Sequence, residues 1–317
     1  MNRIKGRHSQ MYNFIVNPNA RSGLGQSVWN ELEAILKKEK VEYQVFFTRY
    51  QKHATSIVRE ITSDGEEHTI VALGGDGTVN EVVNGIVHFD KTILGYIPIG
   101  SSNDFARGLL LPTNPVDALN TILTCPNLHP MNVGEMRYRN KLRRFAVSAG
   151  VGFDADICHE VVVSHVKKFL NKLGIGKLTY VCVALHRLIV TSPCKYEITL
   201  DRNKKITYER AYFAAIMNNR FEGGGVKFAP DAKNDDDKLD VCVVANIGKL
   251  KALMLFPMAF AGIHTKFKGV YMHRAADYRI QTSRALPLHT DGEPIFLQND
   301  ISFRCAPEKL RVITTKP

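Results

Sequence analysis

The sequence predicts an α/β N-terminal domain with a doubly wound parallel sheet, followed by a β-rich C-terminal sandwich domain with helical insertions. Three observations lead to this prediction. Strands and helices alternate through the first third of the chain, glycine-containing polar turns follow three of those strands, and strand patterns dominate after about residue 125. Strict alternation indicates a parallel sheet, because two parallel strands are joined by a crossover that is usually a helix.

Four apolar, β-prone runs occupy the first third, and each is followed by a helical pattern. The pattern is clearest where Trp29, Leu32, Ile35 and Leu36 recur at intervals of one to four residues on one helical face. The expected strands are 12–16, 41–48, 69–73 and 93–99, and the expected helices are 26–40, 54–61, 79–87 and one that begins near Asp104.

The rest of the chain is rich in strands, many of them joined by short turns such as Arg139-Asn140 and Arg202-Asn203. Strands are expected at 131–137, 141–149, 196–200, 208–217, 239–245, 270–273, 278–282, 286–289, 294–297 and 301–305, with helices at 155–170, 177–190 and roughly 249–263. The character changes near residues 126–130. We therefore expect domains over residues 1–127 and 128–317, with the last residues of the chain packing back on the first domain.

Composition limits the kinds of partner. The chain has 317 residues, of which 44% are hydrophobic and 23% charged, so it can bury a core and is not of the disordered class. Its 42 Lys and Arg exceed its 31 Asp and Glu by 11. This excess favours a partner that carries phosphates, such as nucleic acid, a nucleotide or an anionic membrane, although a generally basic surface would also produce it.

The cysteines and the apolar runs indicate the compartment. The six cysteines form no CxxC pair, which argues against a zinc ribbon and a disulfide framework and suits a reducing cytosol. The longest apolar run, 252–263, is too short to cross a bilayer and contains Pro257. We therefore expect a soluble, cytoplasmic protein that touches a membrane only from its surface.

The strongest local signal is the string from Leu73 to Glu81, LGGDGTVNE, where a buried strand meets a helix. Its glycines let a ligand approach the backbone, and the helix start offers N–H groups to phosphate oxygens. Asp76 would repel bare phosphate, so it implies a bridging cation such as Mg²⁺. The alternative is a tight turn in which Asp76 caps a helix. The string fits neither the Walker A pattern nor GxGxxG.

Two further polar turns follow neighbouring strands. In the string from Ile99 to Arg107, Ser101 can donate to a phosphate and Asp104 can extend a cation network, although Ser102 or Asn103 could equally cap the next helix. The first strand ends in NPNARSGLG, over residues 17–25. Three such turns at one edge of a parallel sheet favour a polyphosphate site there.

These strings carry a family resemblance. NPNARSG, GGDGTVNEVVNGI, GSSNDFARGL, GVGFDA, FEGGGVKFAPDAKNDDDKLDV and DGEP occur in this order, and together they resemble the diacylglycerol kinase catalytic-domain superfamily, above all its soluble bacterial lipid kinases. The likeness runs from about Tyr12 to Ile313. The GGDGT string is shared with the NAD kinases and phosphofructokinases, whereas the first and last strings are more particular to lipid kinases.

The resemblance implies an enzyme. Its members hold ATP in the α/β domain and are lipid kinases that depend on ATP and Mg²⁺. This chain would therefore transfer the γ-phosphate of ATP to a lipid hydroxyl, either that of diacylglycerol, which gives phosphatidic acid, or that of a sphingoid-like lipid. Two alternatives remain open: a soluble kinase of the NAD kinase type, and a non-catalytic regulator that binds lipid or nucleotide.

The resemblance also assigns roles to residues. Glu293, in the turn Asp291–Pro294, would be the general base that takes the proton of the lipid hydroxyl. Asp76 and Asp104 would organise Mg²⁺ and water. Nucleotide contacts would fall on Asn17, Arg21, Ser22, Gly23, Thr48, Gly74, Gly75, Asp76, Gly77, Thr78, Val79, Asn80 and Ser101.

A structural Mg²⁺ is implied in the acidic loop, held by the side chain of Asp236 and the carbonyls of Lys233 and Lys238. The sequence departs from the family here, because Asp237 stands where the family has glycine, and a left-handed turn costs more with a side chain. It departs again at Leu24, where some relatives have lysine, so that Arg21 or the weaker candidate Lys172 would supply the positive charge.

The expected partners follow from the charge and the resemblance. Basic residues gather in the second half, some interleaved with Phe267 and Tyr271, and no RNA or DNA module is recognisable. We expect a membrane lipid as substrate, peripheral contact with the anionic inner membrane surface and no nucleic acid, while a homodimer remains open.

Overall fold

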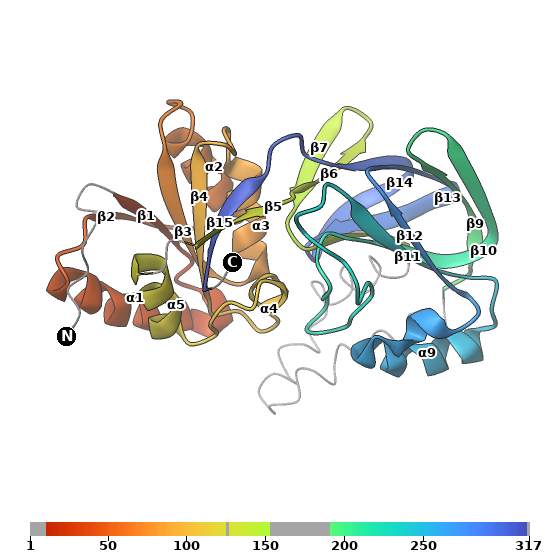
Figure 1. The fold of residues 1–317 in the computed structure, drawn as a ribbon, viewed down its shortest axis with the longest axis horizontal. Helices are drawn as coiled ribbons and strands as arrows, with labels where there is room; N and C mark the ends of the chain where they lie inside the picture. The colour runs from red at the N-terminus through yellow and green to blue at the C-terminus, as the bar shows by residue number, and fades with distance from the viewer. Residues whose placement is uncertain (1–10, 125–126, 153–190, 316–317) are drawn as a thin grey trace. The chain divides into compact units, whose positions relative to one another are not determined.

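The computed structural model describes residues 11–124, 127–152 and 191–315, which form two compact units (Figure 1). The first unit comprises the chain up to Val133 together with the residues from Pro307 onward, and the second comprises Gly134–Ala306. The helices expected at 155–170 and 177–190, and Lys172, lie outside the described residues. The fold class predicted from the sequence is confirmed in both units.

The sheet of the first unit has the strand order β2-β1-β3-β4-β15-β5. The five strands β2, β1, β3, β4 and β15 run parallel, and β5 pairs antiparallel with β15. The bounds are β1 Tyr12–Val16, β2 Tyr43–Phe47, β3 His68–Gly74, β4 Thr92–Pro98, β5 Asn127–Met131 and β15 Leu310–Thr314. The expected boundary at 127 thus falls at the start of β5, which is held in the first sheet by β15.

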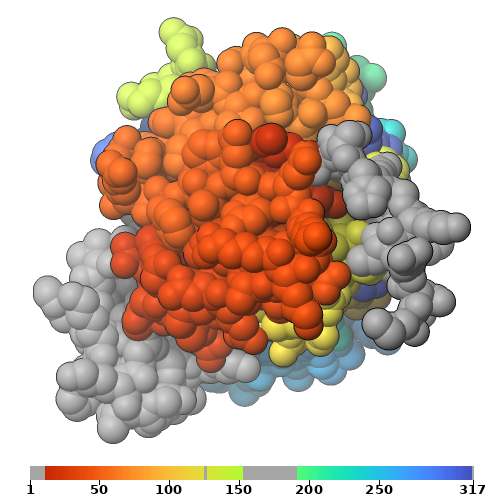
Figure 2. Space-filling model, turned by 90° about the vertical axis from the view of Figure 1, so that its left-hand side faces the viewer, coloured from red at the N-terminus to blue at the C-terminus, as the bar shows by residue number. Residues whose placement is uncertain are grey.

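Helices cover this sheet on both faces. Alternate strand residues such as Phe14 and Val71 join an apolar cluster with Trp29 of α1 and Leu119 of α5, while the intervening Ile15 is buried on the opposite face. Figure 2 shows the side of the molecule formed mostly by this early part of the chain, coloured red to orange. The helices are α1 Ala20–Lys38, α2 His53–Ile61, α3 Asp76–Gly85, α4 Asp104–Gly108 and α5 Pro115–Thr124.

Helix α5 has no counterpart among the expected helices. It begins at Pro115, and the side chain of Asn114 accepts hydrogen bonds from the N–H groups of Val116 (2.9 Å) and Asp117 (3.2 Å). An N-cap asparagine followed by proline at the first helical position is a recognised start signal. The signal for α5 was therefore present in the sequence.

The second unit is built on one extended antiparallel sheet, in the order β12-β11-β10-β8-β13-β14-β6-β7, with β9 paired to both β10 and β13. The long strands β10 and β13 each pair with β9 at one end and with β8 at the other, across register shifts. Such strands turn the corner between the layers of a sandwich. The bounds are β6 Gly134–Tyr138, β7 Lys141–Phe145, β8 Ser148–Gly152, β9 Cys194–Leu200, β10 Lys204–Met217, β11 Leu239–Ala245, β12 Val270–Ala275, β13 Asp277–Thr290 and β14 Glu293–Cys305.

Several expected strands of this unit are divided or joined. The run 131–137 is split between β5 and β6, and 141–149 between β7 and β8. The runs 278–282 and 286–289 are one strand, β13, and the runs 294–297 and 301–305 are one strand, β14. The joined strands cross polar residues, such as Ser283 and Asn299, that read as turns in the sequence.

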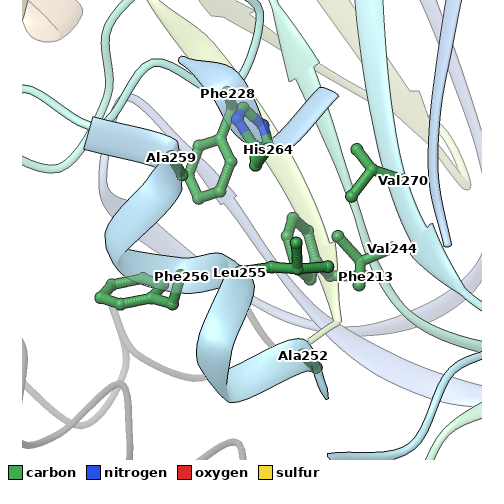
Figure 3. A pocket seen from close by; sticks show the side chains of 9 residues that line it. All are labelled: Phe213, Phe228, Val244, Ala252, Leu255, Phe256, Ala259, His264 and Val270. Carbon is green, nitrogen blue, oxygen red and sulfur yellow. The ribbon is translucent and has the colours of Figure 1, made fainter. Parts of the chain in front are cut away.

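One long helix and a short 3₁₀ helix complete the described part of this unit. They are α9 (Lys249–Ala261) and η1 (Ile263–Lys266). Helix α9 lies over a small apolar pocket, which is lined by side chains from β10, β11 and β12 as well as by the helix itself (Figure 3). The lining residues are Phe213, Phe228, Val244, Ala252, Leu255, Phe256, Ala259, His264 and Val270.

Candidate functional site

Two glycine loops meet at the carboxyl ends of β3 and β4. A Cβ atom on Gly100 would lie 2.7 Å from the Cα of Gly75, and one on Gly74 would lie 2.2 Å from the Thr78 hydroxyl oxygen. Neither position has room for a side chain, so glycine is required for the loops to pack this closely. The two loops therefore lie side by side at one edge of the sheet, as the sequence predicts.

The carboxylate of Asp76 joins these loops. Its Oδ2 accepts a hydrogen bond from the N–H of Asp104 at 3.2 Å, and its Oδ1 accepts one from the N–H of Phe105 at 3.1 Å. Burial raises the pKa of Asp76, and the hydrogen bonds from the backbone N–H groups of Phe105, Asp104 and Asn103 oppose that rise. Asp76 therefore caps the helix after β4, as in the alternative interpretation, although it caps α4 rather than the helix on which it lies.

Asp104 lies directly beside this contact. Its side chain is buried, and its Oδ1 lies 3.9 Å from the Arg107 guanidinium nitrogen Nη1. The structure thus places both predicted carboxylates at the junction of the two loops. The roles that we expect of Asp76 and Asp104 toward a cation remain predictions.

Tyr96 is a site residue that the sequence analysis missed. Asn103, which was considered there only as a possible cap of the next helix, occupies the N-cap position of α4, but its side chain makes no capping hydrogen bond. The buried Tyr96 hydroxyl lies 3.2 Å from the carbonyl oxygen of Gly74 and 3.3 Å from Oδ1 of Asn103, whose side-chain nitrogen donates to the carbonyl of Gly100 at 3.1 Å. Burial, followed by the charges of Asp76 and Asp104, raises the pKa of Tyr96 well above its usual value, so the hydroxyl keeps its proton. This proton stabilises the junction of the loops.

The first strand ends beside the same helix. Asn17 donates its side-chain N–H to the Thr78 hydroxyl at 3.4 Å, and its Oδ1 accepts the N–H of Asn19 at 3.1 Å. Next come Arg21, Ser22 and Gly23, which are exposed and have φ angles of 48°, 63° and 97°. The left-handed conformation costs free energy at Arg21 and Ser22, although not at Gly23, and such strain concentrates at functional sites. The strained backbone of this loop therefore coincides with the residues for which the resemblance predicts nucleotide contacts.

The turn after β2 is held by α3 as well. The carboxylate of Glu81 accepts hydrogen bonds from the N–H groups of Lys52 (2.7 Å) and Ala54 (3.2 Å), which fixes the start of α2. Thr48 donates its N–H to the carbonyl of Val16 at 2.8 Å. Glu81 is a second residue without a role in the sequence analysis, although it ends the GGDGTVNE string.

This edge of the first unit is chemically suited to phosphate. At the start of α3, Thr78 and Val79 donate their N–H groups to the carbonyl of Gly75 at 2.9 and 3.2 Å, whereas the N–H groups of Asp76 and Gly77 have no carbonyl available within the helix. The positive end of the helix dipole adds to their attraction for anions. Asn80 is buried in the second turn, and Ser101 is exposed at the tip of the neighbouring loop. The sequence-predicted nucleotide residues thus lie on the turns that follow β1, β2, β3 and β4.

In the second unit, the turn that presents Glu293 is anchored by Asp291. The carboxylate of Asp291 accepts hydrogen bonds from the N–H groups of Ala146 (2.9 Å), Val147 (2.8 Å) and Ser148 (3.0 Å). Asp291 and Gly292 both have positive φ, 48° and 81°, as a two-residue type I′ hairpin requires. Glu293 is the first residue of β14 and lies opposite Thr290.

A buried histidine supports the same turn. Nδ1 of His289 accepts the N–H of Gly292 at 3.3 Å, and Nε2 lies 3.0 Å from the Glu222 carboxylate. With Nδ1 as acceptor, the ring proton is on Nε2 and is donated to Glu222. Both side chains are buried, so the pair is shielded from water. The sequence analysis did not single out either residue.

One carboxylate of the acidic loop is paired with an arginine. The carboxylate of Asp236 forms an ion pair with Arg274, and its Oδ1 accepts the N–H of Lys238 at 3.3 Å. Asp237 adopts the left-handed conformation, with φ of 61°, so the aspartate that replaces the family glycine tolerates that backbone. Arg274 would compete with a cation for the Asp236 carboxylate, and the assignment of Lys233, Asp236 and Lys238 to a structural Mg²⁺ stays a prediction.

Two further absences concern only the described residues. Residues 11–124, 127–152 and 191–315 contain no group of three or more His, Cys, Asp or Glu side chains that could hold a metal ion. Within the same ranges, no helix combines the length and the hydrophobicity that crossing a membrane requires.

Comparisons with known proteins assign both parts of the chain to a family. A family model described as the diacylglycerol kinase catalytic domain matches residues 11–136, and one described as the YegS C-terminal NAD kinase beta sandwich-like domain matches residues 147–314. The chain is 31% identical over 310 residues to a Bacillus subtilis protein named "Putative lipid kinase YtlR", covering 95% of this chain and 98% of the relative. It is 29% identical over 249 residues to a Bacillus subtilis diacylglycerol kinase, covering 76% and 78% of the two chains.

Solved structures show the same fold. The crystal structure of a diacylglycerol kinase from Bacillus anthracis superposes with a TM-score of 0.70 at 22% identity, covering 98% of each chain. An NAD kinase from Archaeoglobus fulgidus in complex with ATP superposes with a TM-score of 0.52 at 10% identity, covering 96% of this chain and 94% of the other.

Proposed function

The chain belongs to the diacylglycerol kinase family of lipid kinases, and from this premise we propose that it transfers the γ-phosphate of ATP to the hydroxyl of diacylglycerol. Family membership supports a kinase, and the finer choice of acceptor is our proposal. The observation that carries the phosphate-binding part of the proposal is the contact between Gly75 and Gly100, which packs two loops together at the N-terminus of α3.

The nucleotide would bind at the carboxyl edge of the first sheet. There the N–H groups of Asp76 and Gly77, at the start of α3, donate to phosphate oxygens, and Ser101 donates from the neighbouring loop. Arg21, which is exposed in the strained turn after β1, supplies a positive charge to the same phosphates. Mg²⁺ bound with ATP would add positive charge on the phosphate oxygens, and Asp76 is the carboxylate best placed to orient its water ligands.

Glu293 would take the proton of the acceptor hydroxyl. Phosphoryl transfer depends mainly on positioning and charge stabilisation, with a base that accepts the proton as the acceptor oxygen attacks. The Asp291 contacts and the His289–Glu222 pair hold the turn that carries Glu293, so the backbone of this turn is fixed before substrate binds. We also propose that the enzyme acts in the cytoplasm, at the inner membrane surface, where its acceptor resides.

The proposal is tested by incubating the protein with γ-labelled ATP, Mg²⁺ and diacylglycerol in mixed micelles and extracting the lipid. We expect labelled phosphatidic acid. In Glu293→Gln, which keeps the side-chain shape but cannot accept the proton, we expect kcat to fall about 10²–10⁴-fold while ATP affinity measured by calorimetry changes little.

Glu209→Gln is the matched control, because Glu209 is an exposed glutamate on β10 of the same unit. Its kcat should equal that of the unmodified protein. Label transferred to NAD in the absence of lipid would replace the proposal with an NAD kinase activity. ATP binding without transfer to any acceptor would instead leave a nucleotide-binding regulator.

A further inference from the structure

Helix α9 is apolar on the face that points away from the sheet as well as on the face that packs against it. Ala252, Leu255 and Ala259 are buried toward the pocket of Figure 3. On the opposite side, one turn apart, Leu250 is 67% exposed and Met254 is 57% exposed. A helix on the surface of a globular protein normally carries polar residues on that side. The outer side of α9 therefore departs from the usual pattern.

The exposed apolar residues continue past the end of the helix. Phe260 lies near the last turn of α9, Ile263 opens η1, and Phe267 follows it, with exposed fractions of 41%, 44% and 39%. We call Leu250, Met254, Phe260, Ile263 and Phe267 together the α9 surface. Single exposed apolar residues are ordinary, but a run of this length on one short segment indicates an interaction surface.

The charged side chains on the segment that carries the α9 surface are all positive. Lys249 and Lys251 lie at the start of the helix, and Lys266 and Lys268 lie after its end, all four exposed. The sequence contains no Asp or Glu anywhere from Val241 to Ala276. The surface therefore combines apolar side chains with lysines at both ends, and its own segment contributes no negative charge.

We propose that the α9 surface docks on an anionic lipid bilayer, with Leu250, Met254 and Phe260 entering the headgroup region and the flanking lysines contacting lipid phosphates. Apolar side chains framed by lysines are the pattern of interfacial helices, which lie in the membrane plane. A second copy of the chain suits the surface less well, because pairing it with itself would bring like charges together.

The inference rests on the proposed function, since an enzyme that phosphorylates a bilayer lipid has to work at the bilayer. It goes further in naming the part of the chain that makes the contact. Docking and catalysis use different residues, because no residue of the α9 surface belongs to the nucleotide loops or to the turn of Glu293.

Docking is tested by sedimentation with sucrose-loaded vesicles of phosphatidylglycerol or of phosphatidylcholine, at low salt. We expect the protein to bind phosphatidylglycerol at least about tenfold more tightly. The double variant Leu250→Ser/Met254→Ser should lose at least about tenfold in binding to phosphatidylglycerol, because two inserting side chains are removed. Lys266→Gln/Lys268→Gln should weaken the binding and flatten its dependence on salt.

Leu110→Asn is the matched control. Leu110 is an 82% exposed leucine in the first unit with φ of 55°, a conformation that asparagine tolerates well, so its vesicle binding should stay unchanged. Turnover of a water-soluble short-chain diacylglycerol should be the same in all variants. Unchanged vesicle binding by both double variants would overturn the proposal.

A change of oligomeric state in the Leu250→Ser/Met254→Ser variant, seen by analytical ultracentrifugation with vesicle binding unaltered, would also overturn it in favour of a contact between copies. If docking is lost as expected but the unmodified protein phosphorylates no lipid, the docking surface stands and the proposed function fails. The two claims are therefore separated by vesicle binding on one side and turnover on the other.

Discussion

A hydrogen bond of 3.1 Å joins the side-chain carboxylate of Asp76 to the backbone N–H of Phe105. It links the first residue of α3 to the first turn of α4, across 29 positions of sequence. Asp76 therefore holds the glycine loop after β3 against the loop after β4. Asp76, which the sequence analysis expects to organise Mg²⁺, therefore also holds the two loops of the site together.

Asp76→Ala should consequently lower the free energy of unfolding as well as abolish turnover. Loss of a helix-capping side chain costs about 0.5–2 kcal/mol. Asp76→Asn keeps an acceptor oxygen and should lose less stability while losing comparable activity. Urea denaturation followed by circular dichroism measures the first quantity, and equal stability of all three proteins would refute the capping role.

Asp291→Ala should be among the more destabilising changes in the second unit. Three backbone N–H groups lose a charged acceptor at once, and such loss typically costs about 1–3 kcal/mol per buried group. We expect kcat to fall too, because Glu293 is two residues away on the same turn. Asp291→Asn, which preserves the shape, should recover part of the stability. A folded Asp291→Ala protein with full activity would contradict this assignment.

Glu222 and His289 should behave as a coupled pair. Each is buried and lies within 3.0 Å of the other, so removing either leaves its partner without its bond. A double-mutant cycle with Glu222→Ala and His289→Ala should give an interaction free energy of about 0.5–3 kcal/mol. Additive losses in thermal or urea unfolding would mean that the two side chains act independently.

Asp240 should make stability depend on pH in an unusual direction. Burial, with a smaller contribution from the charge of Asp231, raises the pKa of Asp240 to about 6. Because the folded state then holds its proton more tightly than the unfolded state, the free energy of unfolding should fall as pH rises from about 4 to about 6. The effect is at most about 3 kcal/mol.

Asp240→Asn cannot ionise and should remove this slope. The comparison is made by urea unfolding at several pH values between 4 and 7, where the difference between variant and unmodified protein should grow in favour of the variant as pH rises. Parallel curves for the two proteins would show that Asp240 does not titrate in this range.

Much of the first unit could be predicted from sequence because its strands are buried on both faces and end in glycine turns. β1 matches its expected bounds, and the three turns that were expected to bind phosphate follow β1, β3 and β4. What could not be predicted is which partner each polar side chain chooses. The carboxylate of Glu81 accepts a hydrogen bond from the N–H of Lys52, 29 positions earlier, and the sequence around either residue does not predict that pairing.

The second unit shows the same limit more clearly. Residues 141–149 are expected from the sequence to form one strand, yet the strand is interrupted at Ala146 and Val147. Their N–H groups bond to Asp291, which lies about 145 positions along the chain. A pattern of apolar residues predicts which residues are buried, but it does not predict which backbone N–H groups will donate to a carboxylate far away in the sequence.

The position of β15 has a consequence for biosynthesis. This strand lies between β4 and β5 in the first sheet, yet the ribosome makes it after the entire second unit. Until those last residues emerge, β4 and β5 each lack a neighbour, and an unpaired strand edge is a template for pairing with other chains. The first unit therefore cannot complete its sheet until the second unit has been translated, even though most of the first unit is synthesised before it. A frameshift or stop codon just before Leu310 would leave the turn of Glu293 translated but the nascent protein open to aggregation and proteolysis.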